Sequence, residues 1–352
     1  MYWGLGVTHQ EQRDICLEAE RLGYERIWVA EGYGSDAATI LGWLAAQTTT
    51  IGIGSAMFQI PARTPAMTAM TGATLDVLSG GRMCLGLGSS GPQVAEGWHG
   101  IAFAPTLQAM REYVDIVRLV LHRERLSYQG TVYRVPLSGR TVRTLKLSIN
   151  PVQDTIPIYL GTMGPLGCAL AGEIADGWMP MFLSPAHFDE HFGPHLQDGA
   201  ERSGRPLSEL DVNPSLQLCI DPDLARARDQ LRPMLALYIG GMGTREQNFY
   251  HRLVTRYGFG ESADEVQQLY LAGRREDAER ALPAELIDAV SLCGPADVIA
   301  DRLKLFTDVG ISHLTVTPAL GTTDVDRISQ LRRLAEIADL VPDQPALDAL
   351  PD

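Results

Sequence analysis

A glycine pattern in residues 82–100, RMCLGLGSSGPQVAEGWHG, is the first feature of the chain that could do chemistry. Gly86, Gly88 and Gly91 spell G-x-G-x-x-G after an apolar run, which is the pattern of a dinucleotide-binding turn. That chemistry needs a regular helix whose free amides face a pyrophosphate. Two more glycines interrupt the residues that would form this helix, and two other strands precede the motif. We therefore expect a loop whose missing side chains let the backbone approach a flat ligand.

A second turn, GTMGP from Gly161 to Pro165, stands between an apolar strand and a helix. Glycines before a helix expose several backbone amides, which suit a phosphate or another anion. The same residues could also be only the connection between a strand and a helix. The residues alone leave both interpretations open.

Three histidines, His187, His191 and His195, recur every four residues, so one helix would place their imidazoles on a single face. Gly193 and Pro194 interrupt that helix before the third histidine, and no pair of carboxylates completes a ligand set. We expect a solvated helix and no metal.

The elements that must position these residues follow a repeated order of helix, glycine, polar residues and short apolar strand. The repeats are EAERLGYERIWVAEG, TLDVLSGGRMCLGLG, ALAGEIADGWMPMF and LKLFTDVGISHLTVTP, and further strands fit residues 50–58, 156–161 and 212–220. Glycine ends each helix, and an apolar strand without alternation is buried on both faces, as in a parallel sheet. This pattern predicts an α/β fold, a single (β/α)8 TIM barrel.

Two segments interrupt the repeated order. Residues 126–150 carry turn signals between β-branched and aromatic residues, which predicts a hairpin-like excursion, and residues 224–290 are helix-rich and charged. Both would be insertions on barrel loops, where barrel enzymes carry their chemistry. We expect one domain over residues 1–340 and a flexible tail over residues 341–352.

The composition of the chain limits which partners it can have. It has 352 residues, with 43 acidic against 29 basic side chains and a net charge of −14, which repels nucleic acid and anionic membrane surfaces. Five cysteines without C-x-x-C spacing predict free thiols in a reducing compartment. The start has no leader pattern, and no uncharged apolar run reaches about 18 residues. We expect a cytoplasmic protein that binds neither nucleic acid nor membrane.

Six ordered segments together resemble the bacterial luciferase-like family, in particular its branch of coenzyme F420 (deazaflavin)-dependent oxidoreductases. The segments are GSDAATILGWLAAQT, IGIGSAMFQIPARTPAMTAM, LDVLSGGRMCLGLGSSGPQVAEGWHG, IPIYLGTMGP, ALAGEIADGWMP and GGMGTREQNFY. The resemblance runs from about Tyr2 to about Ala335, and six motifs in order are far more specific than one glycine pattern. It implies a (β/α)8 barrel that holds a flavin or deazaflavin at the carboxyl ends of its strands.

The resemblance also implies which residues hold the cofactor. Ser55-Ala56 matches a non-prolyl cis peptide that forms a bulge behind the central ring; from the residues alone it is an ordinary small pair. Serines and glutamine after a strand are likewise common turn formers. The cofactor-binding residues implied are Ser55, Ala56 and Met57, then Gly88, Ser89, Ser90 and Gln93 near the ring edge and polyol chain, and Gly161, Thr162, Met163 and Gly164 at the phosphate.

Two acids remain as candidate catalytic residues, Glu31 and Glu96. Glu31 matches an acid that the family's deazaflavin dehydrogenases place before a catalytic histidine, but Gly32 stands at the histidine position. Gly91 likewise replaces a glutamate of those enzymes. These two replacements argue against alcohol oxidation, because that reaction needs a base near the hydroxyl. The two acids could also be ordinary exposed loop carboxylates, which are common in any protein.

The start of the chain departs from the family in a further way. Residues 2–4, YWG, match the loop that follows a complete first strand, so the first barrel strand is expected to be truncated or replaced.

The function expected is that of a homodimeric oxidoreductase that transfers a hydride between F420 and a small or medium organic substrate. An FMN-dependent monooxygenase of the same fold, supplied by a flavin reductase and oxygen, is the first alternative. A relative that binds the cofactor or has turned to non-redox chemistry is the second, because the usual proton-handling residues are missing.

Overall fold

A computed structural model of the protein describes residues 8–103, 106–137, 139, 142–243, 245–246, 248–311, 313–319 and 326–339. The chain forms two compact units, and each is described by itself. Unit 1 comprises residues 1–89, 104–159 and 331–352, and unit 2 comprises residues 90–103 and 160–330. Residues 2–4, expected to follow a truncated first strand or to help replace it, and the tail at 341–352 lie outside the described residues.

Unit 1 is built on short neighbouring strands in the order β1, β2, β4 and β7, with β3 beside β4. The pairs β1–β2, β2–β4 and β3–β4 are parallel, and every residue of β4 is buried, as the continuous apolar runs predict. β7 continues from unit 1 into unit 2. The bounds are β1 Arg26–Val29, β2 Gly52–Ser55, β3 Phe58–Gln59, β4 Met83–Gly88 and β7 Ile158–Leu160.

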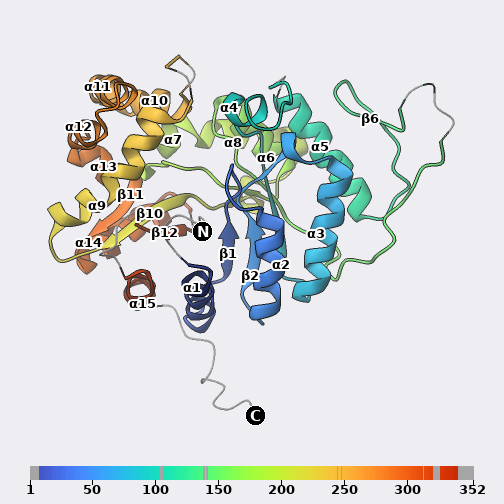
Figure 1. Ribbon diagram of the computed structural model, residues 1–352, viewed down its shortest axis with the longest axis horizontal. Helices are drawn as coiled ribbons and strands as arrows, with labels where there is room; N and C mark the ends of the chain where they lie inside the picture. Colours follow the sequence, from blue (N-terminus) through green and yellow to red (C-terminus); the bar gives the residue numbers. More distant parts are fainter. Residues whose placement is uncertain are drawn as a thin grey trace, which may run out of the picture. The chain divides into compact units, whose positions relative to one another are not determined.

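The helices of unit 1 begin and end where the sequence predicts caps. Thr8 and Glu11 form a reciprocal capping box at α1, and Asp36 and Thr64 cap the amides of α2 and α3. Gly80 ends α3 in the left-handed conformation, with φ 69°. Figure 1 shows α2 and α3 alongside the strands of this unit. The bounds are α1 His9–Arg21, α2 Ala37–Gln47, α3 Pro65–Ser79 and α5 Thr106–Leu121, and α15, Arg327–Ile337, begins in unit 2 and ends in unit 1.

Unit 2 contains the remaining strands. β8 pairs with β9 in parallel, and β10 lies between β11 and β12 in a parallel three-stranded sheet. β11 was not predicted from the sequence, whereas strands near the positions of β8, β10 and β12 were. The bounds are β8 Gly177–Trp178, β9 Asp211–Val212, β10 Ser215–Ile220, β11 Ser291–Gly294 and β12 Thr315–Pro318.

Helices dominate the rest of unit 2 (Figure 1). Residues 224–290 carry a run of five α-helices, α9 to α13, which agrees with the helix-rich segment expected there. No helix in the described part of the chain is long and apolar enough to cross a membrane. The bounds are α4 Pro92–Ala95, α6 Pro165–Ile174, α7 Phe188–His191, α8 Gly193–Ser203, α9 Leu224–Ala236, α10 Phe249–Val254, α11 Gly260–Leu271, α12 Arg275–Arg280, α13 Ala284–Val290 and α14 Ala296–Asp308.

The hairpin expected within residues 126–150 is present as the antiparallel pair β5, Tyr128–Gln129, and β6, Arg134–Val135. Its turn is held by Glu112 of α5, which is 1% exposed. The carboxylate accepts hydrogen bonds from the backbone amides of Thr131, Val132 and Tyr133 at 2.8 to 2.9 Å, and from the Thr131 hydroxyl at 2.7 Å. Burial alone would raise the pKa of Glu112, but these bonds and one from Gln108 lower it to about 2.

Replacing Glu112 with glutamine tests this anchor. The amide offers only one acceptor oxygen, so we expect Glu112→Gln to lower the free energy of unfolding at neutral pH by about 1–3 kcal/mol. The carboxylate's contribution is fully present above its unfolded pKa and is lost as pH falls through about 2. Urea unfolding from neutral to acid pH should therefore show the gap between the two proteins shrinking in acid. A gap that stays constant with pH would contradict the assignment.

Candidate functional site

The end of β2 and the residues after it are bound tightly to β4. The buried hydroxyl of Ser55 donates to the carbonyl of Gly86 at 2.9 Å and accepts from the amide of Gly86 at 3.0 Å. The amide of Ala56 donates to the carbonyl of Val29 in β1 at 2.8 Å. A non-prolyl cis peptide is present here, but it joins Ala56 to Met57, one residue beyond the Ser55-Ala56 bond expected from the sequence.

The glycines of β4 have a role that differs from the one expected. A side chain at Gly86 would collide with the Ser55 carbonyl and would lie 2.7 Å from the Met57 sulfur. At Gly88 it would lie 3.1 Å from Cβ of Met57. Residues 55–57 therefore fill the space into which side chains at Gly86 and Gly88 would project, so this space is not open to a cofactor ring. The glycines therefore let two segments of unit 1 approach each other closely.

The loop after β4 contains no regular helix of dinucleotide-binding length. Gly91 precedes α4, which has only four residues, as the interrupting glycines predict. Ser90 has a left-handed backbone, with φ 59°, and Gln93 is exposed. Glu96, the second candidate acid, is exposed and accepts a hydrogen bond from the amide of Phe103 at 3.0 Å. These residues belong to unit 2, whereas Ser89 ends the first segment of unit 1.

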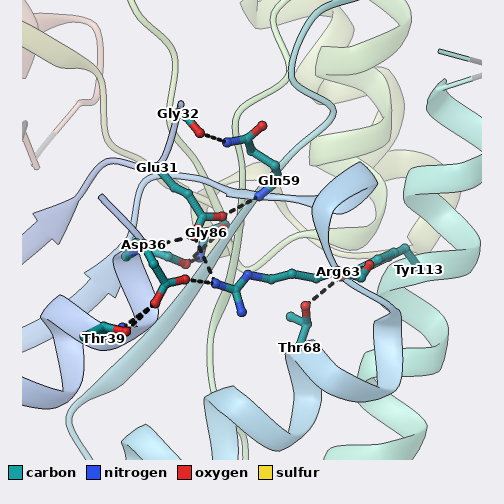
Figure 2. A network of polar contacts seen from close by, with 11 residues as sticks. Glu31, Gly32, Asp36, Thr39, Gln59, Arg63, Thr68, Gly86 and Tyr113 are labelled. Carbon is teal, nitrogen blue, oxygen red and sulfur yellow. Dashed lines mark hydrogen bonds and ion pairs between the residues drawn. The ribbon is translucent and has the colours of Figure 1, made fainter. Parts of the chain in front are cut away.

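Glu31, the first candidate acid, is engaged on both of its carboxylate oxygens (Figure 2). Oε1 accepts from the guanidinium of Arg63 at 3.0 Å and from the amide of Ala37 at 3.2 Å, and Oε2 accepts from the amide of Gln59 at 3.3 Å. The side chains of Glu31 and Arg63 are 8% and 15% exposed. Glu31 thus joins the loop after β1 to the segment after β3.

Arg63 is fixed from several sides. Its guanidinium also pairs with Asp36 and lies 4.6 Å from the centre of the Phe58 ring. The hydroxyl of Tyr113 in α5 donates to the Arg63 carbonyl at 3.1 Å. Partial burial alone would raise the pKa of Asp36, but bonds from Thr39 and the charge of Arg63 outweigh it, so this pKa lies below its usual value.

Gln59 is a candidate ligand-binding residue that the sequence reasoning did not identify. It lies at the end of β3, opposite Gly88 in the parallel register, and is 4% exposed. Its Nε2 donates to the carbonyl of Gly32 at 2.8 Å, while its buried Oε1 has no hydrogen-bond partner among the described residues. Figure 2 shows this oxygen pointing away from Gly32. A buried amide oxygen without a partner is costly, so it suits a donor supplied by a ligand.

The turn from Gly161 to Gly164 connects β7 to α6 in unit 2. Gly164 precedes the helix in an extended conformation, and no described side chain caps its first amides. A side chain at Gly164 would meet nothing within 4 Å. Thr162 donates from its hydroxyl to the carbonyl of Gly167 at 2.7 Å, and the sulfur of Met163 accepts from the amide of Met181 at 3.4 Å. The turn is therefore held by its neighbours while the helix amides stay available.

The three spaced histidines are divided as the sequence predicts, because α7 ends before Gly193 and α8 begins there. The rings of His187 and His191 are parallel at 5.9 Å. Among the described residues there is no group of three side chains that could hold a metal ion.

Comparison with known proteins gives matches over most of the chain. The family model described as luciferase-like monooxygenase matches residues 4–313. A protein of Mycobacterium tuberculosis named as a coenzyme F420-dependent oxidoreductase is 39% identical over 323 residues, covering 90% of this chain and 92% of the relative.

Two solved structures show the fold. The coenzyme F420-dependent tetrahydromethanopterin reductase from Methanopyrus kandleri has a TM-score of 0.81 at 22% identity, covering 97% of this chain and 98% of its own. The FMN-bound oxygenating constituent of 3,6-diketocamphane monooxygenase from Pseudomonas putida has a TM-score of 0.66 at 19% identity, covering 97% of both chains. These likenesses confirm the α/β barrel class that the sequence predicts.

A double-mutant cycle on Glu31 and Arg63 tests the ion pair. We expect Glu31→Gln and Arg63→Met each to lower the free energy of unfolding, because each leaves a partly buried partner without its counter-charge. The double variant should recover part of that loss, with a coupling of about 1–3 kcal/mol in urea unfolding. Glu96→Gln, which changes an exposed acid, should cost little. Additive effects of the two single changes would contradict the pairing.

Proposed function

Because the chain belongs to the luciferase-like monooxygenase family, we propose that it is a coenzyme F420-dependent oxidoreductase that transfers a hydride to or from a small or medium organic substrate. The observation that carries this is the relative named as F420-dependent, which shares 39% identity along 90% of the chain. Bound F420 supplies a deazaflavin ring that accepts or gives a hydride. The protein supplies binding, orientation and proton transfer.

Two features of the structure fit such a ligand. No side chain caps the α6 amides beyond Gly164, and a Cβ added at Gly164 would meet nothing within 4 Å, which leaves room for the cofactor phosphate. The buried acceptor of Gln59 suits an N–H or O–H of the ring or of the substrate. In unit 1 we propose that Ser55, Ala56, Met57, Gly88 and Ser89 contact the ring, and in unit 2 that Ser90 and Gln93 approach its edge and Gly161, Thr162, Met163 and Gly164 seat the phosphate.

Glu31 serves as a positioning residue in this proposal. Its bonds to Arg63 and to the Gln59 amide engage both oxygens, so it holds the end of β3 rather than donating a proton. Glu96, which is exposed, remains the candidate acid of unit 2.

An FMN-dependent monooxygenase is the second candidate function. The observation in its favour is the FMN-bound structure with a TM-score of 0.66, since the same fold accommodates both cofactors. The 39% identical relative favours F420.

The outer face of α3 supports assembly into a homodimer. Met67, Met70, Val77 and Leu78 are 45% to 60% exposed, and they follow one another at helical spacing. No charged side chain interrupts this face, and like-charged chains of net charge −14 approach most easily over an uncharged surface. The cysteines are buried and free, which suits a reducing cytoplasm.

Titration of the purified protein with F420 and with FMN, followed by fluorescence, tests the cofactor. We expect F420 to bind at least tenfold more tightly than FMN. Gly164→Val should weaken F420 binding at least tenfold, about 1.4 kcal/mol, because we expect the branched side chain to block the helix amides, while its Cβ would meet no protein atom within 4 Å.

The matched control is Gly34→Val, at an exposed glycine of unit 1 that also has open space around it. It should leave F420 affinity and melting temperature nearly unchanged. Tighter binding of FMN than of F420 would indicate an FMN-dependent monooxygenase. Binding of neither cofactor would contradict the proposed redox function. A Gly164→Val protein that keeps full affinity would show that the turn is only a connection.

A further inference from the structure

The chain between β6 and β7 is a long connection in unit 1 that the cofactor proposal does not use. Residues 136–157 contain no helix or strand among the residues that the structure describes. Connections of this length without regular structure are uncommon and usually functional. The β5–β6 hairpin and the start of this connection form a segment that we call the arm, defined by residues 125–137 and 142–150. Figure 1 shows β6 to one side of α5, away from the strands of unit 1.

The arm is closed at its base and held to α5. The amide of Leu126 donates to the carbonyl of Leu145 at 2.8 Å, which joins the two ends of the arm. Beside this bond, the guanidinium of Arg125 donates to the carbonyl of Thr144 at 3.1 Å. The turn of the hairpin is fixed by the carboxylate of Glu112, as described above. The arm therefore presents a surface that is already formed, which lowers the entropy cost of binding a partner.

Apolar side chains of the arm face solvent. The exposed fractions are 43% for Val132, 70% for Leu137, 56% for Val142 and 74% for Leu145. Single exposed apolar residues are common on any protein surface. Four of them on one short segment that is held in place indicate a surface that another molecule covers.

The arm is basic, although the chain as a whole is acidic. Its charged residues are all cations, namely Arg125, Arg134, Arg143 and Lys146. All four are exposed, and no ion pair joins any of them to an acid within the described residues. Because the whole chain carries −14, the residues outside these four cations carry −18. The charge of the arm is therefore complementary to that of the rest of the chain.

The connection that carries the arm also continues the exposed face of α3. The buried carboxylate of Asp76 in α3 accepts a hydrogen bond from the amide of Val152 at 2.7 Å. Val152 is 57% exposed, and a side chain at Gly81, just beyond the end of α3, would lie 3.0 Å from its Cγ1. In the last turn of α3, Val77 and Leu78 are 45% and 60% exposed. A molecule that covers the outer face of α3 therefore also reaches the connection that carries the arm.

We propose that the arm binds a second copy of this chain. This inference rests on the homodimer proposed above, and it assigns a contact that holds the two copies together. A twofold interface makes every contact twice, so each arm lies on the other copy. The apolar side chains of the arm pack against that copy, and its cations face a chain whose remaining residues are acidic. This attraction offsets the repulsion between two chains of net charge −14.

Cross-linking with a carbodiimide, which joins a lysine to a carboxylate in direct contact, tests this contact. The chain has only two lysines, Lys146 in the arm and Lys304 in α14. Light-isotope and heavy-isotope copies of the full chain are mixed, left to exchange and then treated. We expect mixed-isotope peptides that join Lys146 of one copy to an acid of the other. Lys304 is the internal control and should join only Asp308 of its own chain, which lies 3.5 Å away.

Changes in the arm should weaken the dimer without unfolding the chain. Leu145→Ser and Arg143→Ser, both at exposed positions, should each raise the dimer dissociation constant at least tenfold in sedimentation experiments. Added salt should weaken the wild-type dimer, and it should weaken the Arg143→Ser dimer less. The matched controls are Leu271→Ser and Arg202→Ser, at exposed positions of unit 2, which should leave the dissociation constant unchanged. Circular dichroism should be the same in all four variants.

A wild-type dimer that gives no mixed-isotope peptide at Lys146, or that keeps its dissociation constant in both arm variants, would overturn the inference and leave the homodimer intact. A monomeric wild-type protein would overturn both. Loss of binding to vesicles of an anionic lipid in the arm variants, with the dimer unchanged, would assign the arm to a membrane surface instead. None of these results depends on F420, so the proposed redox function stands or falls separately.

Discussion

The ion pair between Arg63 and Glu31 is the constraint on which the end of β3 in unit 1 depends. Both side chains are largely removed from water, with 15% and 8% exposure, so either charge would be costly without the other. The planar guanidinium can also bond to Asp36 and lie over the Phe58 ring. Since the second oxygen of Glu31 accepts the Gln59 amide, this pair sets where the end of β3 lies and where the free oxygen of Gln59 points.

This constraint changes how the chemistry is divided among the residues. An acid held by a cation and by two backbone amides is suited to positioning, which is the role that we propose for Glu31. Each unit by itself therefore offers a different group to a ligand: unit 1 the buried amide oxygen of Gln59, and unit 2 the uncapped amides of α6.

Much of the fold could be predicted from local signals. Apolar runs without alternation predicted β2 and β4, glycine predicted the end of α3, and the interrupting glycines predicted that no long helix follows Gly91. β11 was missed because its four residues, Ser291–Gly294, follow α13 directly, without connecting residues that would mark the end of the helix.

The site was less predictable, because its partners are distant in the sequence. Arg63 lies 32 residues beyond Glu31, and the Gln59 amide reaches the carbonyl of Gly32, 27 residues away. The glycines at 86 and 88 could be noticed in the sequence, but what occupies the space beside them could not, because Met57 comes from another strand end. Only the side-chain arrangement distinguishes a positioning carboxylate from a proton donor.

A crystal structure of the protein with bound F420 tests the central claim most directly. The account predicts that the cofactor phosphate accepts hydrogen bonds from the backbone amides of Leu166 and Gly167 at the start of α6, and that a donor on the bound ligand lies within hydrogen-bond distance of Oε1 of Gln59. A phosphate bound elsewhere, with Gln59 Oε1 still lacking a partner, would contradict it.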